Sequence, residues 1–309
     1  MSSPSSSLAA APVDAAVAAA PDARATWWQR AGLYVLLGEL IVLYAPTAKF
    51  LWERWTMSVW HNAHGLLVPF VVAFLVWDHF RAIPPVRPVQ PSRWGFAFVI
   101  PALLLHVLDT GMHTELLSAV SIVLLAPGVS LLAIGSAPTK AIAFPLAFLA
   151  FALPIPLSMT ELLHLVLRQF ATTLTAGIVP HLGIPVFAEG TTLHLAHAEL
   201  EIGDACSGFS TLYAAIAVAC LTAYGATGTG RKLLVLASAA PLAVAANVLR
   251  IVMLTAIVNR TGIDVLDTWI HPASGMLTFA LALPVIFWLG RPTPNTAASH
   301  KPAAAPVAP

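Results

Sequence analysis

The stretch Leu116-Leu-Ser-Ala-Val-Ser-Ile-Val-Leu-Leu-Ala-Pro-Gly-Val-Ser-Leu-Leu-Ala-Ile134 contains no charged side chain. A helix needs about 20 mostly apolar residues to cross the hydrocarbon core of a bilayer, and this stretch has that length. A helix on the surface of a soluble domain would instead place charged residues on its outer face. The stretch therefore predicts a transmembrane helix.

Similar apolar runs occur along most of the chain. The 309 residues are 58% hydrophobic and 9% charged, whereas a soluble domain usually has about 25% charged residues. The net charge of +1 gives no case for binding nucleic acid. We predict an all-α polytopic membrane protein with about eight transmembrane helices, at 32–51, 64–80, 93–109, 115–134, 138–155, 207–227, 232–258 and 274–290.

The two ends of the chain differ from this apolar middle in being rich in Ala, Ser and Pro. We predict a disordered tail over 1–26, one integral membrane domain over 27–290 and a second disordered tail over 291–309. The first 26 residues lack the basic region and compact apolar region of a signal peptide.

The basic residues indicate the orientation in the membrane. With both termini in the cytoplasm, ten of the 15 Lys and Arg residues lie on the inner side, as the positive-inside rule requires. We therefore predict a multi-pass protein of the inner membrane whose segment 156–206 is extracytoplasmic. Within that segment, residues 160–180 indicate an interfacial or re-entrant helix. Alternating residues over 184–202 predict two or three short strands, in a small hairpin-like segment.

Cys206 is the first residue that could carry chemistry, in the sequence Gly203-Asp-Ala-Cys-Ser-Gly-Phe-Ser-Thr211. We predict that Asp204 caps the following helix and that Cys206 lies in its first turn, where the helix dipole favours a thiolate. The small neighbours Ser207 and Gly208 leave room for a substrate. The alternative is a buried cysteine that acts as a small hydrophobic side chain. Cys220, among alanines in mid-span, fits that alternative.

Arg250 and His271 are the other two candidates. An arginine deep in a span costs at least about 2.5–3.5 kcal/mol on insertion scales and usually has a function; the alternatives are an ion pair or snorkelling to the interface. Asn247, one turn before Arg250, could share its hydrogen bonds. His271 lies at the outer start of the last span and suits a general base, although an isolated interfacial histidine can be incidental. All three candidates project to the outer half of the membrane.

The remaining histidines give no metal site. His194 and His197 lie on a predicted strand at a spacing that points them to opposite faces, and no H-E-x-x-H motif occurs. His106 and His164 are interpreted as packing or interface residues. We predict neither a metal nor a cofactor.

Three blocks of sequence together resemble one known family. Asp204-Ala-Cys206-Ser-Gly208, then Asn247-Val-Leu-Arg250-Ile251, then His271 with Ser274-Gly275, are similar to the exosortase/archaeosortase family of membrane transpeptidases. The resemblance covers about residues 145–290, and Phe209 departs from the pattern at a position where many members have Ile or Val.

This resemblance implies a cysteine protease or transpeptidase in which Cys206 is the nucleophile and Arg250 and His271 complete the catalytic set. Its implied partners, besides membrane lipids, are exported proteins with a C-terminal signal made of a short motif, a transmembrane helix and a basic cluster. The motif is Pro-Glu-Pro in many such systems. The acceptor would be a lipid or polysaccharide of the cell surface.

Two other functions remain compatible with the sequence. A transporter or channel could use Arg250 to bind an anion, which predicts inverted repeats, and none is evident in the sequence. A scaffold protein of a surface-polysaccharide export system is the other alternative, and it predicts that Cys206 is dispensable.

Overall fold

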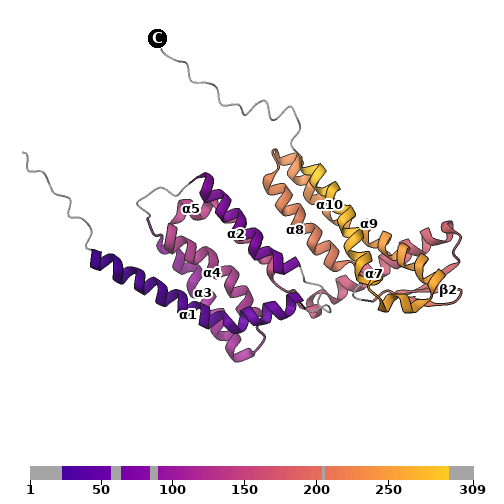
Figure 1. Ribbon diagram of the computed structural model, residues 1–309, viewed down its shortest axis with the longest axis horizontal. Helices are drawn as coiled ribbons and strands as arrows, with labels where there is room; N and C mark the ends of the chain where they lie inside the picture. Colours follow the sequence, from indigo (N-terminus) through magenta and orange to yellow (C-terminus); the bar gives the residue numbers. More distant parts are fainter. Residues whose placement is uncertain (1–22, 57–63, 84–89, 204–205, 292–309) are drawn as a thin grey trace, which may run out of the picture. The chain divides into compact units, whose positions relative to one another are not determined.

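The computed structural model describes residues 23–56, 64–83, 90–203 and 206–291 (Figure 1). The chain divides into two units, Met1–Ala48 and Lys49–Pro309. Helix α1 (Ala23–Thr56) runs through the boundary between them. It begins inside the tail predicted for residues 1–26. The other residues of the two predicted tails, apart from Arg291, lie outside the described ranges.

The first helices of the second unit are α2 (His64–Ala82), η2 (Arg93–Gly95), α3 (Phe96–Met112) and α4 (Leu116–Ile134). Helices α3 and α4 form an antiparallel hairpin in which a Cβ atom on Gly128 would lie 2.7 Å from the Val99 side chain. The carboxylate of Asp109 accepts hydrogen bonds from Thr114 Oγ1 and from the Ser118 backbone N–H, which satisfies a donor at the start of α4.

The predicted span 138–155 is not one helix. It consists of α5 (Ser136–Ala141), α6 (Ala143–Phe148) and η3 (Leu149–Ala152). Pro145 contributes to the break, because a proline clashes with the carbonyl four residues earlier, here that of Ala141, and has no N–H to bond it. The longest uninterrupted apolar helix here, Ala143–Ala152, is shorter than the spanning candidates.

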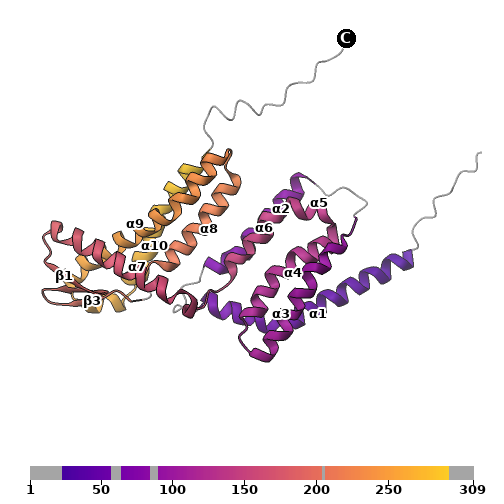
Figure 2. The ribbon, with the colours of Figure 1, turned by 180° about the vertical axis from the view of Figure 1, so that it is seen from behind.

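The C-terminal helices are α8 (Phe209–Gly225), α9 (Thr229–Thr261) and α10 (Ile270–Gly290), with η6 (Ile263–Asp267) between the last two. They lie side by side in both ribbon views (Figures 1 and 2). Their core is built mainly from alanines, among them Ala215, Ala219, Ala239 and Ala243. Such small residues let helix backbones approach closely where lipid removes the hydrophobic driving force.

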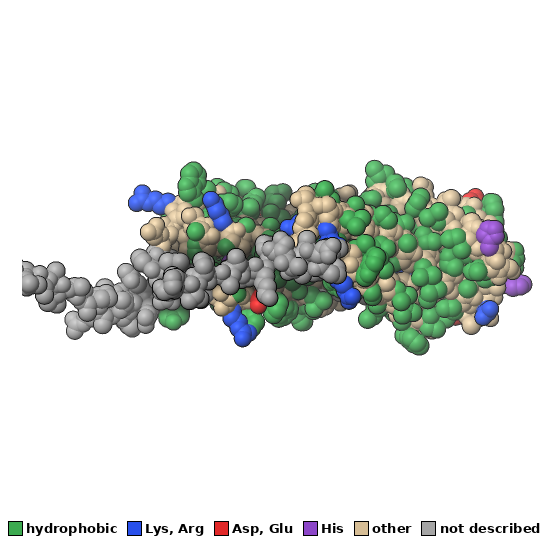
Figure 3. Space-filling view, turned by 90° about the horizontal axis from the view of Figure 1, so that it is seen from above, with side chains coloured by type: hydrophobic (Ala, Val, Ile, Leu, Met, Phe, Trp, Pro, Cys, Tyr) green, Lys and Arg blue, Asp and Glu red, His purple; other side chains and the backbone are tan. Residues whose placement is uncertain are grey.

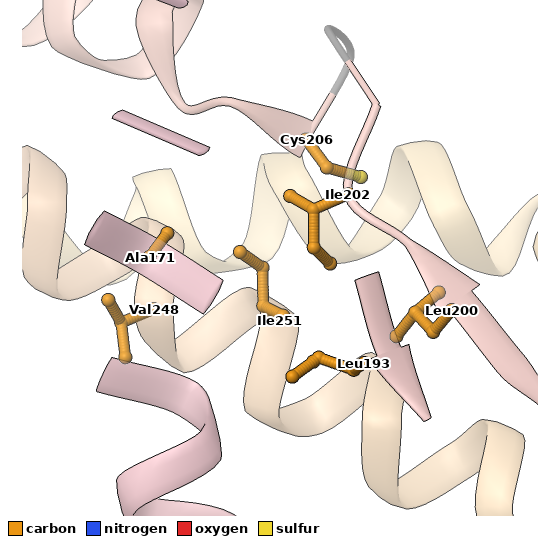
Figure 4. Close-up of a cluster of buried hydrophobic side chains, with 7 residues drawn as sticks. All are labelled: Ala171, Leu193, Leu200, Ile202, Cys206, Val248 and Ile251. Atoms are coloured by element: carbon orange, nitrogen blue, oxygen red, sulfur yellow. The ribbon is translucent and has the colours of Figure 1, made fainter. Parts of the chain in front are cut away.

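A three-stranded antiparallel sheet precedes α8, as the alternating pattern predicts. Its strands are β1 (Val186–Glu189), β2 (Thr192–Leu195) and β3 (Glu199–Glu201), in the order β1-β2-β3. Its inner face contributes Leu193 and Leu200 to a cluster with Ile251 of α9, which also includes Ala171, Ile202, Cys206 and Val248 (Figure 4). The sheet is therefore packed onto the end of the helices where α8 begins.

Within the described residues, seven helices are long and apolar enough to cross a membrane. They are Tyr34–Thr56 of α1, α2, α3 with η2, α4, α7 (Leu157–Ile178) with η4 (Val179–Leu182), α9 and α10; α8 is somewhat shorter. Exposed hydrophobic side chains dominate the face drawn in Figure 3. The prediction of an all-α polytopic membrane protein is thereby confirmed.

For helix α7, length and apolar content suggest a spanning helix, whereas its direction and its surface suggest a helix at the membrane interface. Its length and apolar content match those of a spanning helix, yet Figures 1 and 2 show it crossing the direction of α8, α9 and α10. Its exposed surface has an apolar side with Leu162, Val166 and Phe170, and a polar side with Glu161 and Gln169. A helix with two such sides favours the interface between lipid and water.

Candidate active site

Cys206 and His271 are in contact. The Cys206 Sγ atom lies 3.0 Å from His271 Nε2, although the two residues are 65 positions apart in the chain. Cys206 lies in the turn between β3 and α8, where its backbone N–H donates a hydrogen bond to the carbonyl of Gly203. His271 lies in the first turn of α10. A thiol and an imidazole at this distance can exchange a proton.

The position of Cys206 relative to α8 differs from the prediction. Helix α8 begins at Phe209, so Cys206 lies three residues before it rather than in its first turn. The chain enters the helix through Gly208, whose φ of 81° is left-handed and separates the cysteine from the helical residues. Asp204, predicted to cap the helix, lies outside the described residues.

The electrostatic surroundings of the thiol follow from this position. Burial raises the pKa of Cys206 above its usual range, and the nearby positive charge of Arg250 opposes this rise. Only 8% of the residue is exposed. Burial therefore disfavours the thiolate, and a proton acceptor in contact with the sulfur would make it more nucleophilic.

Arg250 is buried in α9 and lies along the first turn of α10. Its Nε donates to Ser274 Oγ at 3.2 Å, and its Nη2 donates to the backbone carbonyl of His271 at 3.3 Å. A Cβ atom on Gly275 would lie 3.2 Å from the guanidinium carbon. The guanidinium is thus bonded to the same turn that carries the imidazole.

Asn247, one turn before Arg250 on α9, holds the cysteine from the other side. Its Nδ2 donates to the backbone carbonyl of Cys206 at 3.0 Å. The same side chain packs against Gly208, where an added Cβ would lie only 2.6 Å from Asn247 Cγ. A side chain at position 208 would displace Asn247. The left-handed φ of Gly208 disfavours a side chain as well.

His164 of α7 is a residue at this site that sequence reasoning interpreted as a packing or interface residue. Its Nδ1 lies 2.9 Å from Ser207 Oγ, which also accepts the backbone N–H of Phe209 at 3.3 Å. Its ring packs on Phe209, with the ring centres 4.6 Å apart. The signal in the sequence was the helical spacing of polar residues along α7, at Thr160, His164, Thr172 and Thr175. The structure buries all four.

Seven site residues were selected from the sequence, and one of them, Asp204, lies outside the described residues. The structure brings the other six together: Cys206, Ser207, Gly208, Asn247, Arg250 and His271. His194 of the sheet lies apart from them, in contact with Glu189 and Glu199. Among the described residues, no three His, Cys, Asp or Glu side chains form a group that could hold a metal ion.

Comparison with known protein families identifies this chain's family. The family model described as transmembrane exosortase (Exosortase_EpsH) matches residues 52–288. No curated protein and no solved structure matches the chain. The matched range includes Cys206, Arg250 and His271 and spans well over half of the 309 residues. The chain belongs to the transmembrane exosortase family.

Proposed function

We propose that this protein is a membrane cysteine peptidase and transpeptidase that cleaves the C-terminal sorting signal of exported proteins. The observation that carries the proposal is the 3.0 Å contact between Cys206 Sγ and His271 Nε2. The bonds from Arg250 to Ser274 and to the backbone of His271 support it, because they fix a cation beside the same pair. Acyl transfer by a thiol needs a nucleophile and a base, and a positive charge is one means of stabilising the oxyanion.

The first half-reaction forms an acyl-enzyme. His271 Nε2 accepts the thiol proton of Cys206 as the sulfur attacks the scissile carbonyl, and the carbonyl oxygen becomes an oxyanion. The charge of Arg250, which already favours the thiolate, stabilises this oxyanion as well. The protonated His271 then gives its proton to the leaving amine. The C–N bond breaks and a thioester to Cys206 remains.

The second half-reaction releases the protein. A nucleophile from the acceptor, a hydroxyl or an amine, loses its proton to His271 and attacks the thioester carbonyl. The C–S bond breaks and the sulfur recovers its proton from His271. Water would give hydrolysis instead of transfer, so the burial of Cys206, which has 8% of its surface exposed, favours transfer by limiting access of water.

The three C-terminal helices support a site on the extracytoplasmic side. Helix α8 begins beside Cys206, α9 ends on the same side and α10 begins there, so the opposite end of this bundle carries Arg231, Lys232 and Arg291. Basic residues concentrate in the cytoplasm. The cysteine therefore faces the compartment that exported proteins enter.

The proposed substrates are exported proteins that end in a short motif, a transmembrane helix and a basic cluster. Their helix would pack beside the bundle, and the motif would reach Cys206 at its outer end. The proposed acceptor is a lipid or polysaccharide of the cell surface. Proteins of this kind, encoded in the same genome, provide the test substrate.

The deciding experiment compares Cys206→Ala with Cys206→Ser during co-expression with such a substrate. Mass spectrometry of the substrate C-terminus should show processing by the parent protein and only precursor with Cys206→Ala. Hydroxylamine should release a hydroxamate from the parent acyl-enzyme and none from Cys206→Ala. Unchanged processing by Cys206→Ala would remove cysteine catalysis and leave the scaffold interpretation.

A further inference from the structure

The backbone of β3 has one side bonded and one side open. The N–H of Ile202 donates to Thr191 at 2.9 Å, and the N–H of Leu195 donates to the carbonyl of Ala198 at 2.8 Å. Because the bonded residues of an antiparallel pair alternate, Ala198, Leu200 and Ile202 direct their backbone groups toward β2. Glu199 and Glu201 direct theirs away from it.

The open side lies at the edge of the sheet, since β3 is the last strand in the order β1-β2-β3. The carbonyl of Glu201 accepts the N–H of Gly203 at 3.1 Å. Among the backbone groups of the described residues, none is hydrogen-bonded to the N–H of Glu199, the carbonyl of Glu199 or the N–H of Glu201. These groups are an edge to which an extended polypeptide could add.

This edge leads directly to the thiol. The strand ends at Glu201, and the bond from the Cys206 N–H to the Gly203 carbonyl turns the chain back. Cys206 and Ile202 consequently belong to one packed cluster, and Figure 4 shows their side chains next to each other at the end of the strand. Ile202, the residue directly after the open edge, therefore lies beside Cys206.

We infer that the open edge of β3 binds the substrate segment next to the scissile bond as an added strand. The inference rests on the proposed peptidase function and names the means by which that site holds its substrate. Attack on a peptide carbonyl needs an extended, fixed backbone, and strand addition provides it through main-chain hydrogen bonds that do not depend on the side chains of the substrate. The ligand is thus an unfolded segment of polypeptide rather than a folded domain.

The first test exchanges one residue in two ways. Glu201→Pro removes the outward N–H but keeps the carbonyl, and proline is tolerated on an edge strand. Glu201→Ala removes the carboxylate and keeps the N–H. The alanine variant is therefore the reference for the proline variant. With a synthetic peptide that spans the processing site of the substrate used above, KM for Glu201→Pro should be about fivefold to tenfold higher than for Glu201→Ala, as loss of one such hydrogen bond implies.

The second test changes the peptide and leaves the protein intact. Replacing single amides of the peptide by esters removes one N–H at a time, so processing should fall at alternate positions only, because the N–H groups of a strand point alternately to the two sides. Alkylation of the buried Cys206 would show whether Glu201→Pro disturbs folding. If it does, the ester series decides the case.

The outcomes separate the inference from the function beneath it. An ester series without alternation, or equal KM for Glu201→Pro and Glu201→Ala with Cys206 still required, would overturn strand addition alone. Processing that persists in Cys206→Ala would overturn the peptidase function itself.

Discussion

The two cysteines of this chain lie 14 positions apart, and their surroundings have little in common. The turn that carries Cys206 is held by contacts to three other helices: Sγ to His271 of α10, the carbonyl to Asn247 of α9, and the adjacent Ser207 to His164 of α7. Cys220, in the middle of α8, packs against a hydrophobic cluster that includes Phe148 and Ala217. A thiol becomes a candidate nucleophile through what distant helices place around it.

Backbone conformation contributes to the same difference. Cys220 lies in regular helix, whose carbonyls and amides bond within the helix. Among the described residues, the Cys206 backbone bonds through its N–H to Gly203 and through its carbonyl to Asn247, and its side chain contacts His271 of α10. An irregular turn buried by sheet and helices can thus be held in one geometry by side chains.

The difference in reactivity between Cys206 and Cys220 should depend most strongly on His271. His271→Gln removes the proton acceptor from Cys206 Sγ while keeping a polar side chain, and processing should fall about 10²–10⁴-fold, the usual contribution of a general base. The rate is measured with the peptide substrate. His181→Gln, at an exposed histidine of η4, is the matched control and should leave the rate unchanged; equal effects of the two variants would refute the base role.

Arg250→Lys should have the next largest effect. An ammonium keeps the charge but lacks the planar, rigid donor geometry with which the guanidinium bonds Ser274 and the His271 carbonyl. We expect kcat to fall about 10²-fold. Arg260→Lys at the exposed end of α9 is the control, and retention of most activity by Arg250→Lys would show that charge alone suffices.

Gly208→Ala tests the turn itself. The new methyl group would clash with Asn247. The alanine would also have to keep the left-handed φ of Gly208, which costs roughly 1–2 kcal/mol before the clash is counted. The protein should melt at lower temperature in detergent and process its substrate more slowly. Gly225→Ala, at the end of α8 where nothing lies within 4 Å of the added atom, should change neither measurement. Similar melting of both variants would argue against a constrained turn.

The pH dependence of thiol alkylation should shift in Arg250→Gln. Burial raises the pKa of Cys206 and the Arg250 charge lowers it, so loss of that charge raises the pKa further. The thiolate, which reacts with iodoacetamide, then forms only at higher pH, and the midpoint of the rate profile moves upward. The profile is measured in a Cys220→Ala background with Arg260→Gln as control. A midpoint that stays or moves downward would contradict the assigned influence of Arg250.

Cys220→Ala should have the smallest effect. The residue is only partly buried, against the cluster that includes Phe148 and Ala217, and an alanine there removes only the small sulfur atom. Processing should remain within about twofold and stability should change by less than about 1.5 kcal/mol. Loss of processing comparable to that of Cys206→Ala would remove the distinction between the two thiols.

Several features could be predicted because they depend on residues close together in the chain. The span predicted at 115–134 became α4, which begins one residue later, and the alternation over 184–202 became the sheet. The single span expected at 138–155 was wrong, because the helix is interrupted at Ile142, three residues before Pro145. Proline alone does not decide such a break, since Pro127 lies inside the continuous helix α4. The helix start at Asp204 was wrong as well, since Gly208, in the N-cap position, directly precedes the first helical residue.

The amino-acid order alone determined that most of this chain is apolar helix, that Cys206 lies at a junction between a polar segment and a helix, and that Arg250 needs partners. Only the tertiary structure decided which partners meet. The contacts of Cys206 with His271 and of Ser207 with His164 join residues 65 and 43 positions apart. Such contacts depend on the crossing of α7 and the packing of α8, α9 and α10. Helical periodicity specifies which face of a helix is buried and leaves open which other helix buries it.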